Sequence, residues 1–187
     1  MKSVAGGGIL TFDLGRHLGW ATADRPAIDR WPPGLFVPGR TPPRPAIELD
    51  TIVIAPPSTP HGPYFLGFEN VVCDLLDRLK PRAVAYEAAI AAHKGGKKGK
   101  GEGIEAVRRL VGKAAVLEMR CADQGIPCFE IHNGTVKKQF AGNGRAEKSD
   151  MVDACILRGW TPPDPNAADA AAVLECAVRS LKHKEQL

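Results

Sequence analysis

Residues 9–23, ILTFDLGRHLGWATA, most constrain what this chain can fold into. Residues 8–14 read as a first strand and residues 18–23 as a second, with only residues 15–17 between them. That spacing predicts an antiparallel hairpin. The first strand carries the Asp13 carboxylate toward a core, which is costly unless a donor or a cation meets it. We therefore expect Asp13 either to cap the turn or to hold a metal ion or a phosphate.

Beyond this hairpin the chain alternates between strand and helix patterns. Short apolar or β-branched runs predict further strands at residues 51–55, 83–87 and 126–131. Apolar residues at helical spacing predict helices at residues 64–79, 107–121 and 146–158. A last helix should follow, with Asp164 as its N-cap and Pro165 in its first turn. This order predicts one α/β domain, residues 1–187, built in layers around a mixed five-stranded sheet.

The helix over residues 107–121 should bury one continuous stripe of side chains. The residues expected on that stripe are Val107, Leu110, Val111, Ala114, Leu117 and Cys121.

Two segments stand apart from this alternation. Residues 25–45 are rich in proline, which is expected to exclude helix and central strand. We interpret them as an insertion, either an ordered surface excursion or an extended arm, that carries Trp31 and Phe36. Residues 93–103, HKGGKKGKGEG, are expected to form a flexible basic loop.

Composition narrows the functional classes. The five cysteines are odd in number and contain no CxxC pair, so we expect reduced, buried thiols rather than a structural zinc site. The sequence starts without the charged and apolar regions of a signal peptide, and no apolar run is long enough to span a membrane. We expect a cytoplasmic protein with no membrane partner.

Three carboxylates occupy positions that such a sheet could bring together. Asp13 ends the first strand and Glu87 the fourth, while Asp169 lies in the first turns of the last helix, three residues after Asn166. Each alone has an ordinary interpretation, as a turn residue, a solvated strand end or an acid near a helix N-terminus. Together they would repel each other unless a divalent cation joined them, and oxygen ligands suit Mg²⁺ or Mn²⁺. Two such ions are the usual device for in-line phosphodiester cleavage.

These motifs resemble those of the RuvC family of Holliday-junction resolvases, within the RNase H-like superfamily. ILTFDLGRHLGWA is similar to the family's first strand with its catalytic Asp, and VAYEAAI to the strand with its catalytic Glu. TVKKQFAGNGRAEKSDMV resembles the basic segment after the fifth strand, and NAADAAAVLECAV resembles the final acidic helix. The resemblance covers nearly the whole chain outside the Pro-rich segment. It implies an RNase H-like three-layer fold with strand order 3-2-1-4-5.

The resemblance also implies roles for individual residues. Asp13, Glu87 and Asp169 would be catalytic and would hold two Mg²⁺ ions per site, replaceable by Mn²⁺, with Asn166 as a fourth ligand. Lys148, within AEKS, falls where the family places a lysine near the scissile phosphate. A second such position falls on Lys137 or Lys138.

The chain departs from the family pattern at two positions. Asn166 stands where an acidic residue or a histidine is frequent. Asp164 could supply the missing charge, although its better explanation is the helix cap. Ile90 replaces an aromatic residue three positions after Glu87, and we expect it to insert apolar bulk between bases instead.

The charge distribution favours a nucleic-acid partner. Residues 93–113 carry seven basic and two acidic residues, so this window, at +5, exceeds the +4 of the whole chain. Glycines between the lysines would let such a loop follow phosphates without base-specific contacts. The residues expected to contact DNA, together with Ile90, Lys137 and Lys138, are Lys94, Lys97, Lys98, Lys100, Arg108 and Arg109.

The resemblance implies a Mg²⁺-dependent crossover junction endodeoxyribonuclease that resolves four-way junctions or other branched DNA by paired symmetric nicks. Because a junction has two-fold symmetry, we expect a homodimer, and the resemblance points to the helix over residues 107–121 as the dimer face. The short chain, the Pro-rich insertion and Asn166 suggest a phage or prophage version.

Three other functions stay open at this point. A related RNase H-like nuclease could act on structured RNA and would need no junction geometry. An ATP-binding protein of the actin-like fold could use DLG as a phosphate loop, although that architecture needs a longer chain. A catalytically inactive DNA-binding module would account for Asn166.

Overall fold

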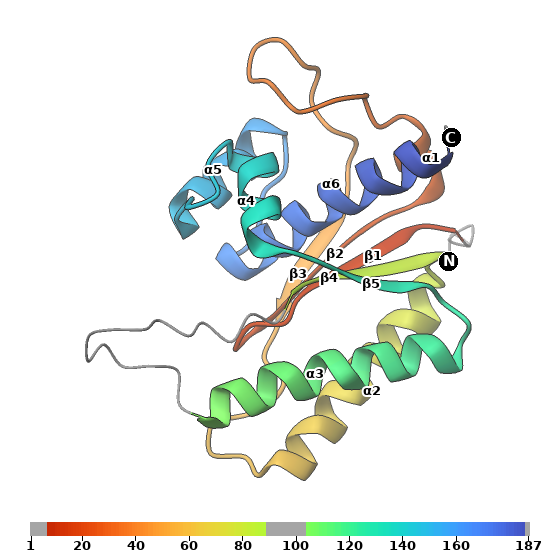
Figure 1. Cartoon of the computed structure of the whole chain (residues 1–187), viewed down its shortest axis with the longest axis vertical. Coiled ribbons are helices and arrows are strands. Elements are labelled where there is room, and N and C mark those ends of the chain that lie inside the picture. Colours follow the sequence, from red (N-terminus) through yellow and green to blue (C-terminus); the bar gives the residue numbers. More distant parts are fainter. Residues whose placement is uncertain (1–6, 89–103, 186–187) are drawn as a thin grey trace.

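The computed structural model describes residues 7–88 and 104–185, which form a five-stranded sheet with helices on both faces (Figure 1). The strands are β1 (Ile9–Asp13), β2 (Leu18–Ala23), β3 (Glu48–Ile52), β4 (Ala83–Glu87) and β5 (Cys128–Ile131). Their order is β3-β2-β1-β4-β5, with β2 antiparallel to β1 and β3, and with β1, β4 and β5 parallel. This confirms the expected mixed sheet and its strand order.

The helices are α1 (Arg25–Asp29), α2 (His61–Leu79), α3 (Ile104–Asp123), α4 (Asn133–Ala141), α5 (Lys148–Leu157) and α6 (Pro165–Glu185). Helices α2 and α3 cover one face of the sheet, and α4, α5 and α6 cover the other (Figure 1). Alternate residues of β1 therefore enter different cores. Leu10 and Phe12 pack with Phe68 of α2, whereas Ile9 packs with the buried residues of α6.

Helix α6 lies close against the sheet because its inner face is made of small residues. Thr11 of β1 donates its hydroxyl to the Ala170 carbonyl at 2.9 Å. A Cβ built on Gly19 of β2 would lie 2.1 Å from the Asn166 carbonyl oxygen, so only glycine fits there. The fully buried alanines of the helix are Ala167, Ala168, Ala170, Ala171, Ala172 and Ala177.

The Pro-rich segment contains a helix, so the expectation that its prolines exclude helix is wrong for residues 25–29. Helix α1 begins with Pro26 in its first turn, and Asp24 caps it by accepting a hydrogen bond from the Ala27 N–H at 2.8 Å. Proline is compatible with a first helical turn, because the N–H that it lacks has no partner inside the helix there.

Three further local expectations differ from the structure. Strand β3 ends at Ile52 instead of Ala55, because its pairing with β2 uses residues 48–52 and leaves Val53 exposed. Val111 is exposed and does not belong to the buried stripe of α3. A helix, α4, occupies the basic segment after β5, where none was expected. It is capped by His132, whose Nδ1 accepts the Gly134 N–H at 3.2 Å.

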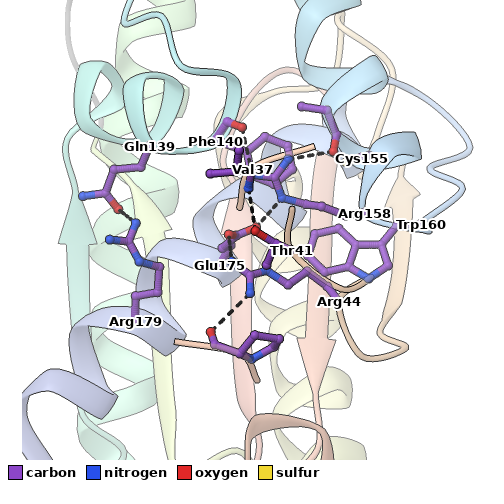
Figure 2. A network of polar contacts seen from close by, with 12 residues as sticks. Val37, Thr41, Arg44, Gln139, Phe140, Cys155, Arg158, Trp160, Glu175 and Arg179 are labelled. Carbon is purple, nitrogen blue, oxygen red and sulfur yellow. Dashed lines mark hydrogen bonds and ion pairs between the residues drawn. The ribbon is translucent and has the colours of Figure 1, made fainter. Parts of the chain in front are cut away.

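A buried ionic network fixes the rest of the Pro-rich segment, residues 30–45 (the arm), to α6 (Figure 2). Arg44 donates to one Glu175 carboxylate oxygen at 2.8 Å, and Arg158 donates to the other. The guanidinium of Arg158 also lies against the rings of Phe36 and Phe140, 4.5 and 3.9 Å from their centroids. The arm is therefore an ordered excursion rather than a loose extension.

All five cysteines are free thiols, as expected. The expectation that they are buried is confirmed for Cys121, Cys155 and Cys176 and is wrong for Cys73 and Cys128, which are only partly buried. Within residues 7–88 and 104–185, no helix combines the length and the apolar character needed to cross a membrane.

Candidate active site

Asp13 stands at the carboxyl end of β1, where the strand gives way to the turn into β2. One of its carboxylate oxygens accepts the Gly15 N–H at 3.0 Å, so the side chain does cap this turn. Burial raises its pKa, against the opposing influence of the Gly15 N–H, Lys113 and Lys148. The cap therefore does not compensate the charge fully.

Glu87 ends the neighbouring parallel strand, β4, whose Tyr86 is in register with Phe12 of β1. The two carboxylates therefore leave the same edge of the sheet. The amide of Asn133, the first residue of α4, donates to the Glu87 carboxylate. Asn133 is a site residue that the sequence did not single out. Its place directly after β5, the strand beside β4, is the signal that could have found it.

Helix α6 brings Asp169 and Asn166 to this edge. Burial, followed by the negative charges of Asp13 and Asp169, raises the pKa of Glu87 to about 8. Burial, followed by the charge of Asp13, likewise raises the pKa of Asp169 to about 6. The three carboxylates are thus close enough to disfavour one another's ionisation.

Asp164 has a structural role at the start of α6. Its Oδ1 accepts hydrogen bonds from the backbone N–H groups of Asn166 and Ala167, at 2.8 and 3.0 Å, and from the Thr51 hydroxyl at 2.6 Å. These bonds hold its pKa below the usual range. They support its interpretation as the helix cap.

Two lysines face the carboxylates. Lys148, the first residue of α5, has its Nζ 3.5 Å from the Asn166 amide oxygen. Lys137 donates to the Ala146 carbonyl at 2.9 Å. The charges of both lysines lower the pKa values of Glu87 and Asp169. Of the pair considered from the sequence, Lys137 therefore lies at the site, whereas the neighbouring Lys138 is exposed.

The donor set at this edge fits a hard divalent cation. Asp13, Glu87 and Asp169 offer carboxylate oxygens and Asn166 offers an amide oxygen, which are the ligands that Mg²⁺ and Mn²⁺ prefer. The pKa values of all three carboxylates are raised first by burial and then by neighbouring negative charge, and a bound cation would offset both effects. Among the described residues, no three His, Cys, Asp or Glu side chains are already grouped tightly enough to hold one ion. The carboxylates would have to draw together on binding.

Two of the remaining residues expected to contact DNA, both on α3, lie within the described ranges. Arg108 is exposed and lies 3.4 Å from Glu105. Arg109 is half-buried, with its guanidinium on the face of Tyr64 and a 2.5 Å hydrogen bond to the Thr59 carbonyl. Outside the described residues are Ile90, Lys94, Lys97, Lys98 and Lys100.

No protein-family model matches the chain, but curated sequences do. The chain is 34% identical over 117 residues to the crossover junction endodeoxyribonuclease RuvC of Thermobifida fusca, a match covering 59% of this chain and 58% of that protein. It is 36% identical over 106 residues to the RuvC of Anaeromyxobacter dehalogenans, covering 56% and 55%. With the RuvC of Streptomyces avermitilis it shares 29% over 133 residues, covering 68% and 69%. The chain thus matches little more than half the length of the first two relatives.

Solved structures show the same fold. The structure of Thermus thermophilus RuvC superposes with a TM-score of 0.62 at 19% identity, over 94% of this chain and 96% of that one. A structure of the same RuvC in complex with a Holliday junction substrate gives a TM-score of 0.61 at 18% identity, over 95% and 96%. The yeast mitochondrial Holliday junction resolvase Ydc2 gives 0.56 at 12% identity, over 96% and 84%.

Proposed function

The chain belongs to the RuvC family, and we propose on that basis that it is a structure-specific endodeoxyribonuclease acting on branched DNA. Its substrates would be four-way junctions or related branches, cut by paired symmetric nicks. The observation that carries this proposal is the meeting of Asp13, Glu87 and Asp169 with Lys148 at one edge of the sheet. The names of the relatives and the junction-bound RuvC structure support the substrate class.

The cofactor in this proposal is Mg²⁺, two ions per site, with Mn²⁺ as a substitute. Asp13, Glu87, Asp169 and Asn166 would hold the ions. When bound, two divalent ions supply Lewis-acid activation of water and charge compensation at the leaving 3′ oxygen.

The other residues of the site bind and orient the substrate. The ammonium groups of Lys148 and Lys137 would bind the oxygens of the scissile phosphate and bring it to the carboxylates. The amide of Asn133 would fix the orientation of the Glu87 side chain. The Gly15 N–H does the same for Asp13.

Paired nicks require two copies of the site, so the proposal includes a homodimer. Helix α3 offers a surface for it. Val111 and Met119 are 51% and 47% exposed although both are large and apolar, and their spacing puts them on one side of the helix.

The test is cleavage of end-labelled synthetic nucleic acids with Mg²⁺. The set would contain a mobile four-way junction, a replication fork, a flap, a linear duplex and a structured RNA. The proposal expects symmetric nicks on the junction that are lost in Asp13→Asn. Asp29→Asn is the matched control, since the Asp29 carboxylate is exposed and pairs with Arg25 at the surface.

The other outcomes separate the remaining candidates. Equal cutting of forks, flaps and junctions would widen the substrate to branched DNA in general. Cleavage of the RNA alone, or ATP binding without any cleavage, would overturn the proposed function. Junction binding without cutting by the unaltered protein would identify an inactive DNA-binding module.

A further inference from the structure

A cavity of about 610 Å³ opens beside the turn between β1 and β2, and neither the proposed metal ligands nor Lys137 and Lys148 line it. Its volume lies within the range of roughly 300–1,000 Å³ typical of small-ligand sites. Residues of the turn, of the segment after β3, and of α2 and α3 line it. Those that matter here are Leu14, Arg16, Val53, Tyr64, Arg109 and Lys113.

The cavity adjoins the carboxylate edge. Its wall begins at Leu14, the residue directly after Asp13. Lys113 of α3 is only 2% exposed. Its Nζ donates a hydrogen bond to the Gly15 carbonyl in the turn. Its charge also acts on Asp13. A ligand in the cavity would therefore lie beside the turn that carries Asp13.

The planar guanidinium of Arg109 forms one wall of the cavity and is held in a fixed position. The Arg109 guanidinium lies 4.3 Å from the centroid of the Tyr64 ring and is tied to the Thr59 carbonyl. Its Nε is buried and has no hydrogen-bond partner among the described residues. Unstacked bases pack on such guanidinium planes, with apolar side chains like Leu14 and Val53 enclosing them.

The charge of the cavity suits a phosphate. Arg16 and Arg109 contribute two positive charges, and Lys113, whose pKa burial lowers to about 8, adds a third that is largely present at neutral pH. The single carboxylate among the described lining residues, Glu105, is already engaged by His61 at 2.5 Å. The cavity thus combines a stacking surface, apolar walls and an excess of positive charge, which together match a nucleotide.

We propose that this cavity binds one unstacked nucleotide of the branched DNA, next to the scissile phosphate. The inference rests on the proposed function and names a subsite for its substrate. Bases at a branch point are the least costly to unstack, so a nucleotide-sized cavity favours branched over continuous duplex DNA.

The test places 2-aminopurine, one position at a time, around the crossover of a four-way junction, and measures its fluorescence with saturating protein. Asp169→Asn would be the background, so that the junction is bound and not cut. The inference expects emission to rise at one position beside the scissile phosphate. It expects Ala106→Trp, which fills the cavity from an exposed position on α3, to abolish that rise.

Two further variants sharpen the result. Ile156→Trp adds the same ring at a 56% exposed position of α5 outside the cavity, and should leave the rise unchanged. Arg109→Lys keeps the positive charge but removes the planar guanidinium on which a base would stack. Since one stacked base contributes about a factor of ten to affinity, this variant should bind the junction about tenfold more weakly.

A rise that survives Ala106→Trp would overturn the inference, as would the absence of any rise on a bound junction. So would a change in sedimentation with Ala106→Trp in the absence of DNA, because a partner subunit would then occupy the cavity. Cleavage by the unaltered protein keeps the two proposals apart. If it cuts junctions but 2-aminopurine does not respond, only the subsite fails, and if it cuts none, the function itself fails.

Discussion

The first turn of α6 lies directly against Gly19 of β2, with the Asn166 carbonyl oxygen where a Cβ on Gly19 would have to be. Gly19 is also the residue paired with Asp13 across the hairpin. One close backbone contact therefore sets how near Asp169 can come to Asp13.

We expect Gly19→Ala to impair cleavage more than folding. The methyl group must push α6 away from the sheet, at a cost of about 1–3 kcal/mol of the free energy of unfolding. The displacement falls at the site, so junction cleavage should drop sharply while the protein stays folded. Thermal melting and cleavage assays measure the two effects. Gly67→Ala, in α2 with only ordinary contacts around its Cβ, is the control and should leave both intact.

Stability without metal should fall as pH rises, because Glu87 is harder to ionise in the folded chain. Its pKa is about 8 in the fold against 4.5 ordinarily. Between pH 4.5 and about pH 8 the unfolded chain has released the Glu87 proton and the folded chain has kept it. The stability that this proton contributes is therefore fully present below pH 4.5 and is lost as the pH rises toward 8. Melting temperatures over this range would measure the loss.

Added Mg²⁺ should raise the melting temperature more at pH 8 than at pH 5.5, since the ion binds the ionised carboxylates. Glu87→Gln should flatten the pH dependence and reduce the Mg²⁺ effect. The exposed Glu130→Gln should change neither. A metal effect independent of pH and of Glu87 would contradict the ligand assignment.

Lys148→Met should lower the rate of cleavage by about 100-fold or more, the usual cost of losing one group that stabilises developing charge. The side chain is exposed, so the melting temperature should stay constant. Lys148→Arg should restore part of the rate, because it returns the charge. Lys138→Met, on α4, should have little effect on the rate, and a loss equal to that of Lys148→Met would point to general phosphate attraction instead.

Arg44→Met should destabilise the protein by about 1–3 kcal/mol, because it removes the hydrogen bonds of Arg44 to the buried Glu175 and to the Pro32 and Gly34 carbonyls, while Arg158 still balances the Glu175 charge. The arm should then become accessible to trypsin at Arg40. Arg25→Met removes an exposed ion pair with Asp29 and should cost less than about 1 kcal/mol. Chemical denaturation and limited proteolysis would compare the two, and an arm that stays resistant in Arg44→Met would show that other contacts hold it.

The parts of the fold that the sequence predicted are those where local pattern and tertiary structure agree. The hairpin over residues 9–23 has strong strand runs and too short a turn for any other connection. Strand β4 and the capped start of α6 were likewise predicted at their observed positions. Asp13 and Glu87 could be placed together because both end neighbouring strands.

The errors arose where a residue's effect depends on its position. Proline is expected to break a helix, yet Pro26 lies in the first turn of α1, which tolerates it. The β-branched run near residue 52 marked a strand, but pairing with β2 decided where it ends. The role of Arg44 could not be predicted at all, because its partner Glu175 is far away in the chain and neither residue has a local pattern.

Helix α6 carries Asp169, a proposed metal ligand, and the arm's anchor, Glu175, on a single continuous element. At 1.5 Å per residue these two are roughly 9 Å apart along the helix axis. Farther along α6, Lys182 donates a hydrogen bond to the Trp31 carbonyl of the arm at 3.0 Å. A displacement of the arm is therefore transmitted through α6 to the Asp169 carboxylate. A partner that bound the arm would act on the position of Asp169 without touching the site.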